Sequence, residues 1–396
     1  MTTANNVVWR TRLRISIAGK NVSTNLAPYI TVFTFNDKTS NEVDDISFTL
    51  EDRENDDADE SGDLFINSWF PTRGDEVEVA ILTYHREGLD DAEELDCGTF
   101  EIDLVSHSAP PNLFSIHAVS NFNSSIRREI HNHKWEKTTL FNICQSIAQG
   151  NGLKLVFEGE DEDISSVDQT DQTDLQFLAK LAEDNDFMIK LTTETLFIVS
   201  QVQLESAAPV MQISRFDMKS CSAAAQAFDL YKEAVARYWS PKTNKLHHAK
   251  VSHGDVSKEQ VAKINSEYAR EHQKTTAHRP SNNNKPHKNE KLVTEHYLDK
   301  ANIYGGGKTL NIRQRFDNAA EAAKVASSRL KQKNRGEWRM EGTLPGNPFL
   351  MAGVTVDVVD YGVYSGRYYI ESTTHSVNKG YTTSFTAHRV LGEVES

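Results

Sequence analysis

Side chains that could bind a metal gather in the segment from 241 to 300. It holds 7 of the 14 histidines, among them His247, His248 and His253. Zinc sites use histidine at fixed spacings such as H-E-x-x-H, or pair it with cysteine, and neither pattern occurs here. The segment also carries 12 Lys and Arg against 7 Asp and Glu, a local charge of +5. We therefore expect a basic, solvated segment without metal ligands.

A glycine-rich stretch, IYGGGKT from Ile303 to Thr309, resembles the end of a phosphate-binding loop. In the pattern G-x-x-x-x-G-K-[ST], the first glycine would fall at Asn302, and no apolar strand precedes that position. We expect a glycine turn that leads into a strand with the sequence TLNIR. The sequence therefore predicts no nucleotide site and no other cofactor.

Carboxylates and cysteines could also carry chemistry, but their placement argues against it. A glycosidase needs two carboxyl groups, one with a raised pKa in an apolar cleft. The acidic residues gather instead in the polar stretches 51–63 and 87–96, which we interpret as solvated loops. Cys97, Cys144 and Cys221 form no CxxC pair, and no G-x-S-x-G motif occurs. We expect no catalytic residues, and keep a cell-wall hydrolase as the alternative of another class.

Composition restricts the class of protein further. The 396 residues include 43 basic and 57 acidic side chains, for a net charge of −14, which disfavours general nucleic-acid binding. The sequence contains no run of about 18 consecutive apolar residues, so it predicts no membrane-spanning helix. The start of the chain lacks an apolar run typical of a secretory signal. We expect a soluble protein of several domains, made in a reducing cytoplasm and without membrane insertion.

The elements that would position any site are mainly strands. Residues 1–119 alternate between apolar and polar side chains, as in Leu13-x-Ile15-x-Ile17, and predict a first antiparallel β-barrel. Residues 120–205 predict a small α+β module, with helices around 140–147 and 175–181 and a hairpin over 187–199. The apolar stripes of these helices are interpreted as core.

The second half of the chain repeats the β pattern. Residues 206–240 together with 301–396 predict a second barrel, which includes a helix over 317–334 that has Asp317 at its N-cap. The segment 241–300 between them is interpreted as a basic, flexible insertion with a helix from about Asp255 to His278. Its charge suggests an arm that docks on an acidic partner; the alternative is a solvated loop.

Three sequence blocks near the start of the chain recur in the same order near its end. The motif G-x-x-V-x-V occurs at 74–79 and 353–358, and G-x-[FY]-x-I-[DE]-x-x-x-H-S begins at Gly98 and again at Gly366. In the third block, Phe114–Val119 is matched with Phe385–Val390. Three blocks in order indicate two copies of one barrel, and three such chains would present six similar barrels in a ring.

Several of these stretches resemble the phage late control D family, the tail hub proteins of contractile phages. The resemblance rests on TLPGNPFLMAGVTVDV (343–358), GRYYIESTTHSVNKGYTTSF (366–385), QTDLQFLAKLAEDNDFMIKL (172–191) and AAEAAKVASSRLKQKN (319–334). It covers about 65–390 and is weakest at 51–63 and 241–300. It implies a fold that is mainly β with α+β, in which two related antiparallel β-barrels of the tail-tube kind flank the α+β module.

The same resemblance implies a structural role in a contractile tail. The chain would be a homotrimeric baseplate hub that adapts the sixfold tail tube to the threefold spike. Its implied partners are the tail tube protein, a separate spike protein, the baseplate wedge proteins and the tape measure protein, while DNA passes through an acidic lumen without specific binding. The implied location is the virion tail, assembled in the bacterial host cytoplasm. Related hubs in bacteriocins and other injection systems, including type VI secretion, are the alternative reading.

Overall fold

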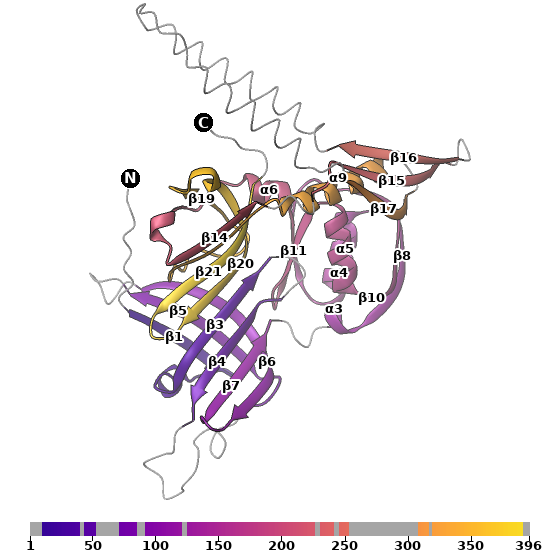
Figure 1. Ribbon diagram of the computed structural model, residues 1–396. Helices are drawn as coiled ribbons and strands as arrows, with labels where there is room; N and C mark the ends of the chain where they lie inside the picture. The colour runs from indigo at the N-terminus through magenta and orange to yellow at the C-terminus, as the bar shows by residue number, and fades with distance from the viewer. Residues whose placement is uncertain are drawn as a thin grey trace, which may run out of the picture. The chain divides into compact units, whose positions relative to one another are not determined.

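The strands that the structure describes form one large sheet and three small ones (Figure 1). The computed structural model describes residues 10–39, 43–52, 71–84, 92–120, 125–225, 230–240, 245–252, 308–316 and 319–390. Within these residues the large sheet has 13 strands. The chain divides into two units: the first contains 1–183, 187–223 and 340–389, and the second contains 184–186, 224–339 and 390–396.

The first β repeat lies within the first unit, and its apolar alternation produces one buried face. Its elements are β1 (Arg10–Ile17), β2 (Lys20–Asn21), α1 (Ser23–Leu26), β3 (Ile30–Lys38), β4 (Asp45–Glu51), β5 (Glu76–Tyr84), β6 (Ala92–Ser108) and β7 (Leu113–Val119). Inward side chains such as Ile15, Phe33, Phe48 and Phe100 are almost completely buried. The loop predicted over 87–96 is partly wrong: β6 already begins at Ala92, because Leu95 faces this core.

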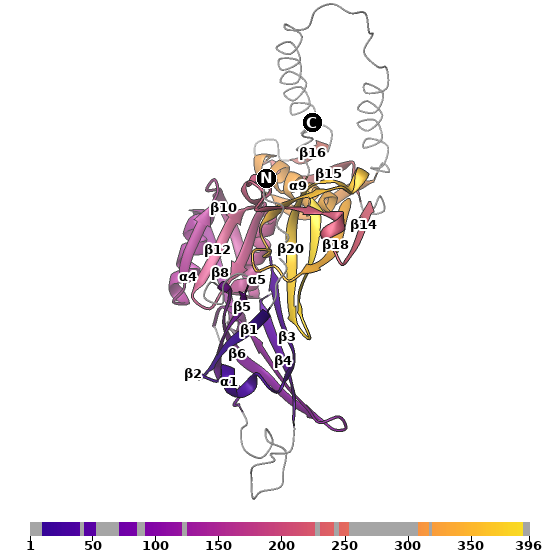
Figure 2. The same ribbon diagram turned by 90° about the vertical axis from the view of Figure 1, so that its left-hand side faces the viewer.

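The second β repeat also lies in the first unit, apart from residues 224–225 and 338–339, and has a core of its own. It consists of β13 (Met211–Ser214), η1 (Arg215–Asp217), β14 (Ser220–Ala225), β18 (Trp338–Pro345), β19 (Thr355–Val359), η2 (Gly362–Tyr364), β20 (Gly366–Val377) and β21 (Tyr381–Arg389). Val356, Tyr368, Ile370 and Phe385 are at the centre of this core. Figure 2 shows β20 passing beside the strands of the first repeat.

The α+β module between the repeats agrees with the pattern of its sequence. It contains α3 (Ser125–Arg128), β8 (Ile130–Thr139), α4 (Leu140–Gly150), β9 (Lys154–Glu158), β10 (Asp163–Thr173), α5 (Asp174–Asp184), β11 (Phe187–Leu191), β12 (Thr195–Ser200) and α6 (Gln201–Ser206). The hydroxyl of Thr139 caps α4 by accepting from the Asn142 N–H at 3.3 Å. The apolar faces of α4 and α5 pack against the β9–β12–β11 sheet and form a third core.

The second unit is smaller, and its described residues include a separate sheet of three strands. It contains β15 (Glu233–Ser240), β16 (Lys245–Ser252), β17 (Thr309–Phe316) and α9 (Ala319–Arg335). α9 confirms the expected helix from residue 319 onward, while the expected N-cap, Asp317, lies outside the described residues. Ala322, Val325, Ala326 and Leu330 of α9 pack on this three-stranded sheet.

The boundaries expected for the second barrel and the insertion differ from this arrangement. The second barrel was expected to include all of 206–240 and 301–396. The segments 233–240 and 309–335 belong instead to the second unit, because α9 buries its apolar stripe on β15 and β17. Residues 245–252, expected within the insertion 241–300, form β16, which pairs with β15 along its whole length. The helix expected from Asp255 to His278 lies outside the described residues. No helix in the described part of the chain is long and apolar enough to cross a membrane.

The two repeats agree in strand register as well as in sequence. Val77 lies opposite Phe100 and Val79 opposite Gly98, while Val356 lies opposite Tyr368 and Val358 opposite Gly366. Gly74 donates its N–H to the Ile102 carbonyl at 2.8 Å, and Gly353 donates to the Ile370 carbonyl at 2.9 Å. Both glycines have a positive φ, 93° and 92°, which explains why glycine occupies both positions.

The match between the third pair of blocks is wrong by two residues. Ala118 lies opposite Ile102, and Ala387 lies opposite Ile370, so Ala118 corresponds to Ala387 and not to Arg389. A shift of two residues keeps every side chain on the same face of a strand, so alternation alone cannot detect it.

Candidate functional site

Of the histidines singled out for a metal site, the structure describes His247 and His248. His247 and His248 are consecutive in β16, and His253 and the later histidines of 241–300 lie outside the described residues. The loop 301–307 also lies outside them, but the strand expected after it is β17. Among the described residues, no group of three or more His, Cys, Asp or Glu could hold a metal ion.

The two repeats meet in a strand pairing that joins them into one sheet. Residues Ser372–Val377 of β20 pair antiparallel with Phe33–Lys38 of β3, with Ser376 opposite Thr34 and Ser372 opposite Lys38 (Figure 1). We call this pairing the junction. It satisfies backbone donors and acceptors that would otherwise form two exposed strand edges.

The side of the sheet opposite the cores, which we call the open face, carries small hydroxyl side chains across the junction. One cross-strand row runs from Thr382 through Ser376 and Thr34 to Ser47. The Thr34 and Ser47 hydroxyls lie 2.6 Å apart and share a hydrogen bond. The other rows across the junction include Asn36, Lys38 and Asp45, and the Lys38 ammonium group lies 3.5 Å from the Asp45 carboxylate. This part of the open face is therefore polar, and its lysine is paired with a carboxylate.

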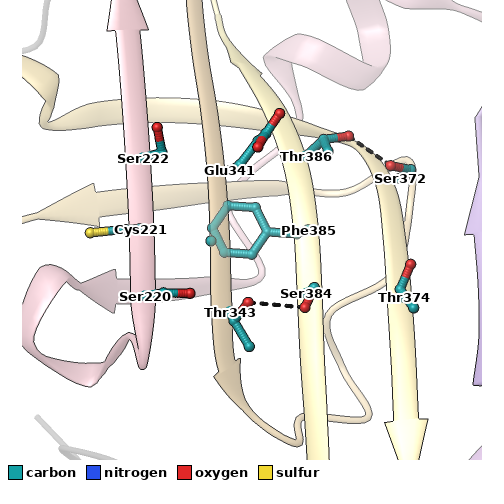
Figure 3. Close-up of a pocket in the computed structure, with 11 residues that line it drawn as sticks. Ser220, Cys221, Ser222, Glu341, Thr343, Ser372, Thr374, Ser384, Phe385 and Thr386 are labelled. Atoms are coloured by element: carbon teal, nitrogen blue, oxygen red, sulfur yellow. Dashed lines mark hydrogen bonds between the residues drawn. The ribbon is translucent and has the colours of Figure 1, made fainter.

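The open face is hollowed over the second repeat. Figure 3 shows the hollow, which has a volume of about 330 Å³ and is lined by residues of β14, β18, β20 and β21. Hydrogen bonds join Thr343 to Ser384 at 3.0 Å and Ser372 to Thr386 at 2.6 Å. Glu341 is the one carboxylate among the lining residues. A hollow of this kind lacks the paired carboxyl groups that glycoside hydrolysis requires.

A buried ionic cluster ties the α+β module to both repeats. Asp37 of β3 is fully buried and bonds the ammonium group of Lys190 from β11. Its other carboxylate oxygen accepts from the Ala352 N–H at 2.8 Å, in the loop before β19. The Lys190 ammonium group also lies 3.3 Å from Oδ2 of Asp44, and Oδ1 of Asp44 accepts from the Lys38 N–H at 3.0 Å. One lysine and two carboxylates therefore connect three parts of the first unit.

The cluster shifts the protonation of its own members. Burial raises the pKa of Asp44 to about 6, although the nearby Lys190 charge acts in the opposite direction. The pKa of Lys190 is raised, because the carboxylates of Asp37 and Asp44 outweigh the effect of burial. The raised pKa of Asp44 resembles that of a catalytic acid, but Asp44 is 8% exposed and its carboxylate lies 3.3 Å from the ammonium group of Lys190. This geometry supports a structural role.

Sequence reasoning missed this cluster, although β3 contained a signal. Phe33 and Phe35 face the core, and the period of two places Asp37 on the same buried face. A carboxylate at an inward position requires a buried partner. No local pattern could identify that partner as Lys190, which is 153 residues away.

The repeated histidines differ between the two halves. His107 is exposed near the end of β6, whereas His375 at the matching position of β20 is fully buried. His375 Nδ1 lies 2.7 Å from the Tyr381 hydroxyl, and its ring stacks on Phe35 with centroids 5.8 Å apart. Burial lowers the pKa of His375 to about 4, so it is neutral near pH 7.

A matching pair of bulges explains the acidic position of the second repeated motif. The register shifts between Ile102 and Leu104 in β6, and again between Ile370 and Ser372 in β20. The extra residues are Asp103 and Glu371. His117 Nδ1 bonds Asp103 at 2.6 Å, and His388 Nδ1 bonds Glu371 at 2.8 Å. Each hydrogen bond joins a bulge to the neighbouring strand. The two histidines are not at equivalent positions, because Ala118 corresponds to Ala387, and His388 is buried.

Replacing Lys190 with methionine should destabilise the first unit strongly. The Lys190→Met variant leaves Asp37 and Asp44 buried without a cation, which typically costs about 3–5 kcal/mol. Denaturant unfolding measures this loss. Lys154→Met is the control, because Lys154 and Glu194 are 77% and 75% exposed and such pairs contribute at most about 1 kcal/mol. Equal losses in the two variants would contradict the role of the cluster.

The buried His375 should make stability depend on pH. Its pKa is about 4 in the folded state, below the ordinary value of 6.5. The unfolded chain therefore takes up the proton first, and stability present above pH 6.5 is lost as the pH falls toward 4. The difference in unfolding free energy between the wild type and His375→Gln should shrink by about 3 kcal/mol over this interval. His107→Gln, at the matching exposed position, is the control; a pH-independent difference for His375→Gln would contradict the prediction.

Comparison with solved structures relates this architecture to known proteins. The chain is similar to a tail protein from Neisseria meningitidis MC58, with a TM-score of 0.62 and 12% identity over 96% of this chain and 97% of that one. It is equally similar to the 43 kDa tail protein of prophage MuSo2 from Shewanella oneidensis, with a TM-score of 0.62 and 12% identity over 96% and 98% of the two chains.

A third similar structure is prophage tail protein gp18 from Listeria monocytogenes EGD-e, with a TM-score of 0.54 and 11% identity over 95% of this chain and 94% of that one. No family model matches the sequence, and no curated protein matches it. The agreement extends over nearly the full length of each tail protein, so it includes both β repeats and the module between them. The chain therefore has the fold of phage tail proteins.

Proposed function

We propose that the chain is the baseplate hub of a contractile phage tail, a homotrimer that adapts the sixfold tail tube to the threefold spike. The observation that carries this proposal is the duplication, in which two β repeats with the same strand register are joined in one sheet. Three such chains present six equivalent repeats and retain threefold symmetry. A ring of this kind can bind a sixfold partner on one side and a threefold partner on the other.

The similarity to tail proteins supports this proposal by a separate route. The similar chains are a tail protein from Neisseria and prophage tail proteins from Shewanella and Listeria, and they match this one almost end to end. The proposed partners are the tail tube, spike, wedge and tape measure proteins, and the proposed location is the virion baseplate after assembly in the host cytoplasm.

We further propose that the open face borders the channel through which DNA passes. The sequence suggested an acidic lumen, but the rows across the junction are mainly hydroxyl side chains, as in Thr382, Ser376, Thr34 and Ser47. Such a surface provides few positive charges to hold phosphate groups. DNA would then move past it without specific binding.

The alternative is that the chain is the hub of a bacteriocin or of another injection system, which the same architecture would also suit. The chain is similar to a chain of the Francisella PdpA–VgrG complex, with a TM-score of 0.51 and 9% identity over 97% of this chain and 53% of that one. The cell-wall hydrolase has less support, because the hollow of the open face contains one carboxylate.

The number of copies per particle tests the hub proposal. Purified tails or tail-like particles should contain three copies of this chain, because two equivalent repeats per chain fill six positions. Quantitative mass spectrometry against the tail tube protein measures this ratio, and imaging should locate the chain at the end of the tube.

Six copies per ring would contradict the proposal, since each chain would then supply one repeat instead of two. Clearing of peptidoglycan by the purified chain in a zymogram would favour the hydrolase instead.

A further inference from the structure

The strands of the two repeats correspond one to one. The first repeat has the order β3-β4-β7-β6-β5-β1, and the second has the order β14-β18-β21-β20-β19-β13. The register matches described above equate β5 with β19, β6 with β20 and β7 with β21. By position in this order, β14 is the equivalent of β3.

The junction uses only the second half of β20. Residues Gly366–Tyr369 pair with β19, the bulge follows at Glu371, and Ser372–Val377 then pair with β3. One edge of β20 therefore has β19 as its neighbour before the bulge and β3 after it. The other edge pairs with β21 on both sides of the bulge.

The equivalent strand β6 is built in the same way but ends without this second neighbour. Residues Ala92–Glu101 pair with β5, the bulge follows at Asp103, and Leu104–Ser108 pair with β7 on one edge. Among the described residues, no strand pairs with the other edge of Leu104–Ser108. Leu104 is 55% exposed there, although it is a large apolar side chain.

The equivalent of β3 also has one open edge. β3 lies between β4 and β20, whereas β14 has β18 on one side and, in the described part of the chain, no strand on the other. Ser220 and Ser222 of β14 are exposed on the hollowed open face. The two halves of a second junction are thus present in each chain, at opposite ends of its pair of repeats.

We propose that Leu104–Ser108 of one copy pairs antiparallel with β14 of the next copy, and so repeats between chains the β20–β3 junction found within each chain. This inference rests on the proposed hub function, which supplies the ring of three chains. Contacts between different patches of identical subunits produce closed rings when the rotation closes. Every repeat in the ring would then have the same two neighbours, and the exposed edges would disappear.

Another open edge, that of β1, does not fit this role. β1 pairs with β5 over its full length, but β2 covers only Ser16 and Ile17 on the other side. Among the described residues, the part of β1 that no strand covers on this side carries Arg10 and Arg12, and also Arg14, which is paired with Glu94. Charged side chains along an edge oppose pairing with another strand. Its counterpart β13 runs parallel to β19, whereas β1 runs antiparallel to β5, so the two repeats differ here.

Cysteine cross-linking of the full chain tests the proposed contact. In β20, Thr374 occupies the position equivalent to Ser106 and faces Asn36 of β3 across the junction, with a hydrogen bond of 2.8 Å. Ser106→Cys is therefore combined with Ser220→Cys or with Ser222→Cys, which test two registers on the same face. Cys221→Ser is included in every variant, because Cys221 is only partly buried, whereas Cys97 and Cys144 are buried.

Mild oxidation should link copies through disulfides in one of the two double variants, Ser106→Cys with Ser220→Cys or Ser106→Cys with Ser222→Cys. Non-reducing gels of that variant should show covalent species up to a trimer. Arg12→Cys combined with the same β14 cysteine is the matched control and should remain unlinked, as should each single variant. Light scattering of the unmodified chain should give the mass of a trimer.

The outcomes separate the two proposals. A trimer by light scattering that links only through the Arg12→Cys control, or through no pair, would overturn the β6–β14 contact and leave the hub function standing. A chain that stays monomeric at every concentration and forms no links would overturn both.

Discussion

The antiparallel pairing of β3 with β20 is the interaction on which the rest of the first unit depends. Without it the chain would contain two separate β repeats, each with an exposed edge at this position. With it the strands of both repeats become one sheet, and hydroxyl rows such as the one through Ser376 and Thr34 cross from one repeat to the other. The relation between the repeats is thereby fixed by backbone hydrogen bonds.

The buried cluster of Asp37, Asp44 and Lys190 strengthens this arrangement at one end of β3. Asp37 follows Phe35 on the inward side of the strand, so its charge requires a partner within the protein. Lys190 comes from the α+β module, and the Ala352 N–H comes from the second repeat. A geometry that needs all three parts favours one arrangement of them, and a hub that transmits symmetry would require such rigidity.

Much of this fold could be predicted from the sequence, because alternation and helix signals are local. The strands around Ile15, Ile46 and Val77, and the helix that ends at Gly150, follow directly from their patterns. The duplication could also be predicted, since the repeated motifs place glycine at 74 and 353, where both residues adopt a positive φ. The two-residue error in the third block arose because a strand looks the same after a shift of two.

The junction and the ionic cluster could not be predicted, because both join residues distant in sequence. Nothing near Thr34 indicates Ser376 as its neighbour, and nothing near Asp37 indicates Lys190. The extent of the second repeat was misjudged for a related reason: β15, β16, β17 and α9 have ordinary patterns, and only their shared core sets them apart from the large sheet. Local patterns identify elements, whereas long-range pairing decides which elements belong together.

Native-state hydrogen exchange at the junction tests the central claim most directly. If the two repeats form one cooperative sheet, the backbone amides of Phe33–Lys38 and Ser372–Val377 that bond across the junction should exchange as slowly as those of β5 in the first core. They should exchange only when the whole first unit unfolds. Exchange at the junction that is many-fold faster, while both cores stay protected, would show that the repeats separate independently and would contradict the account.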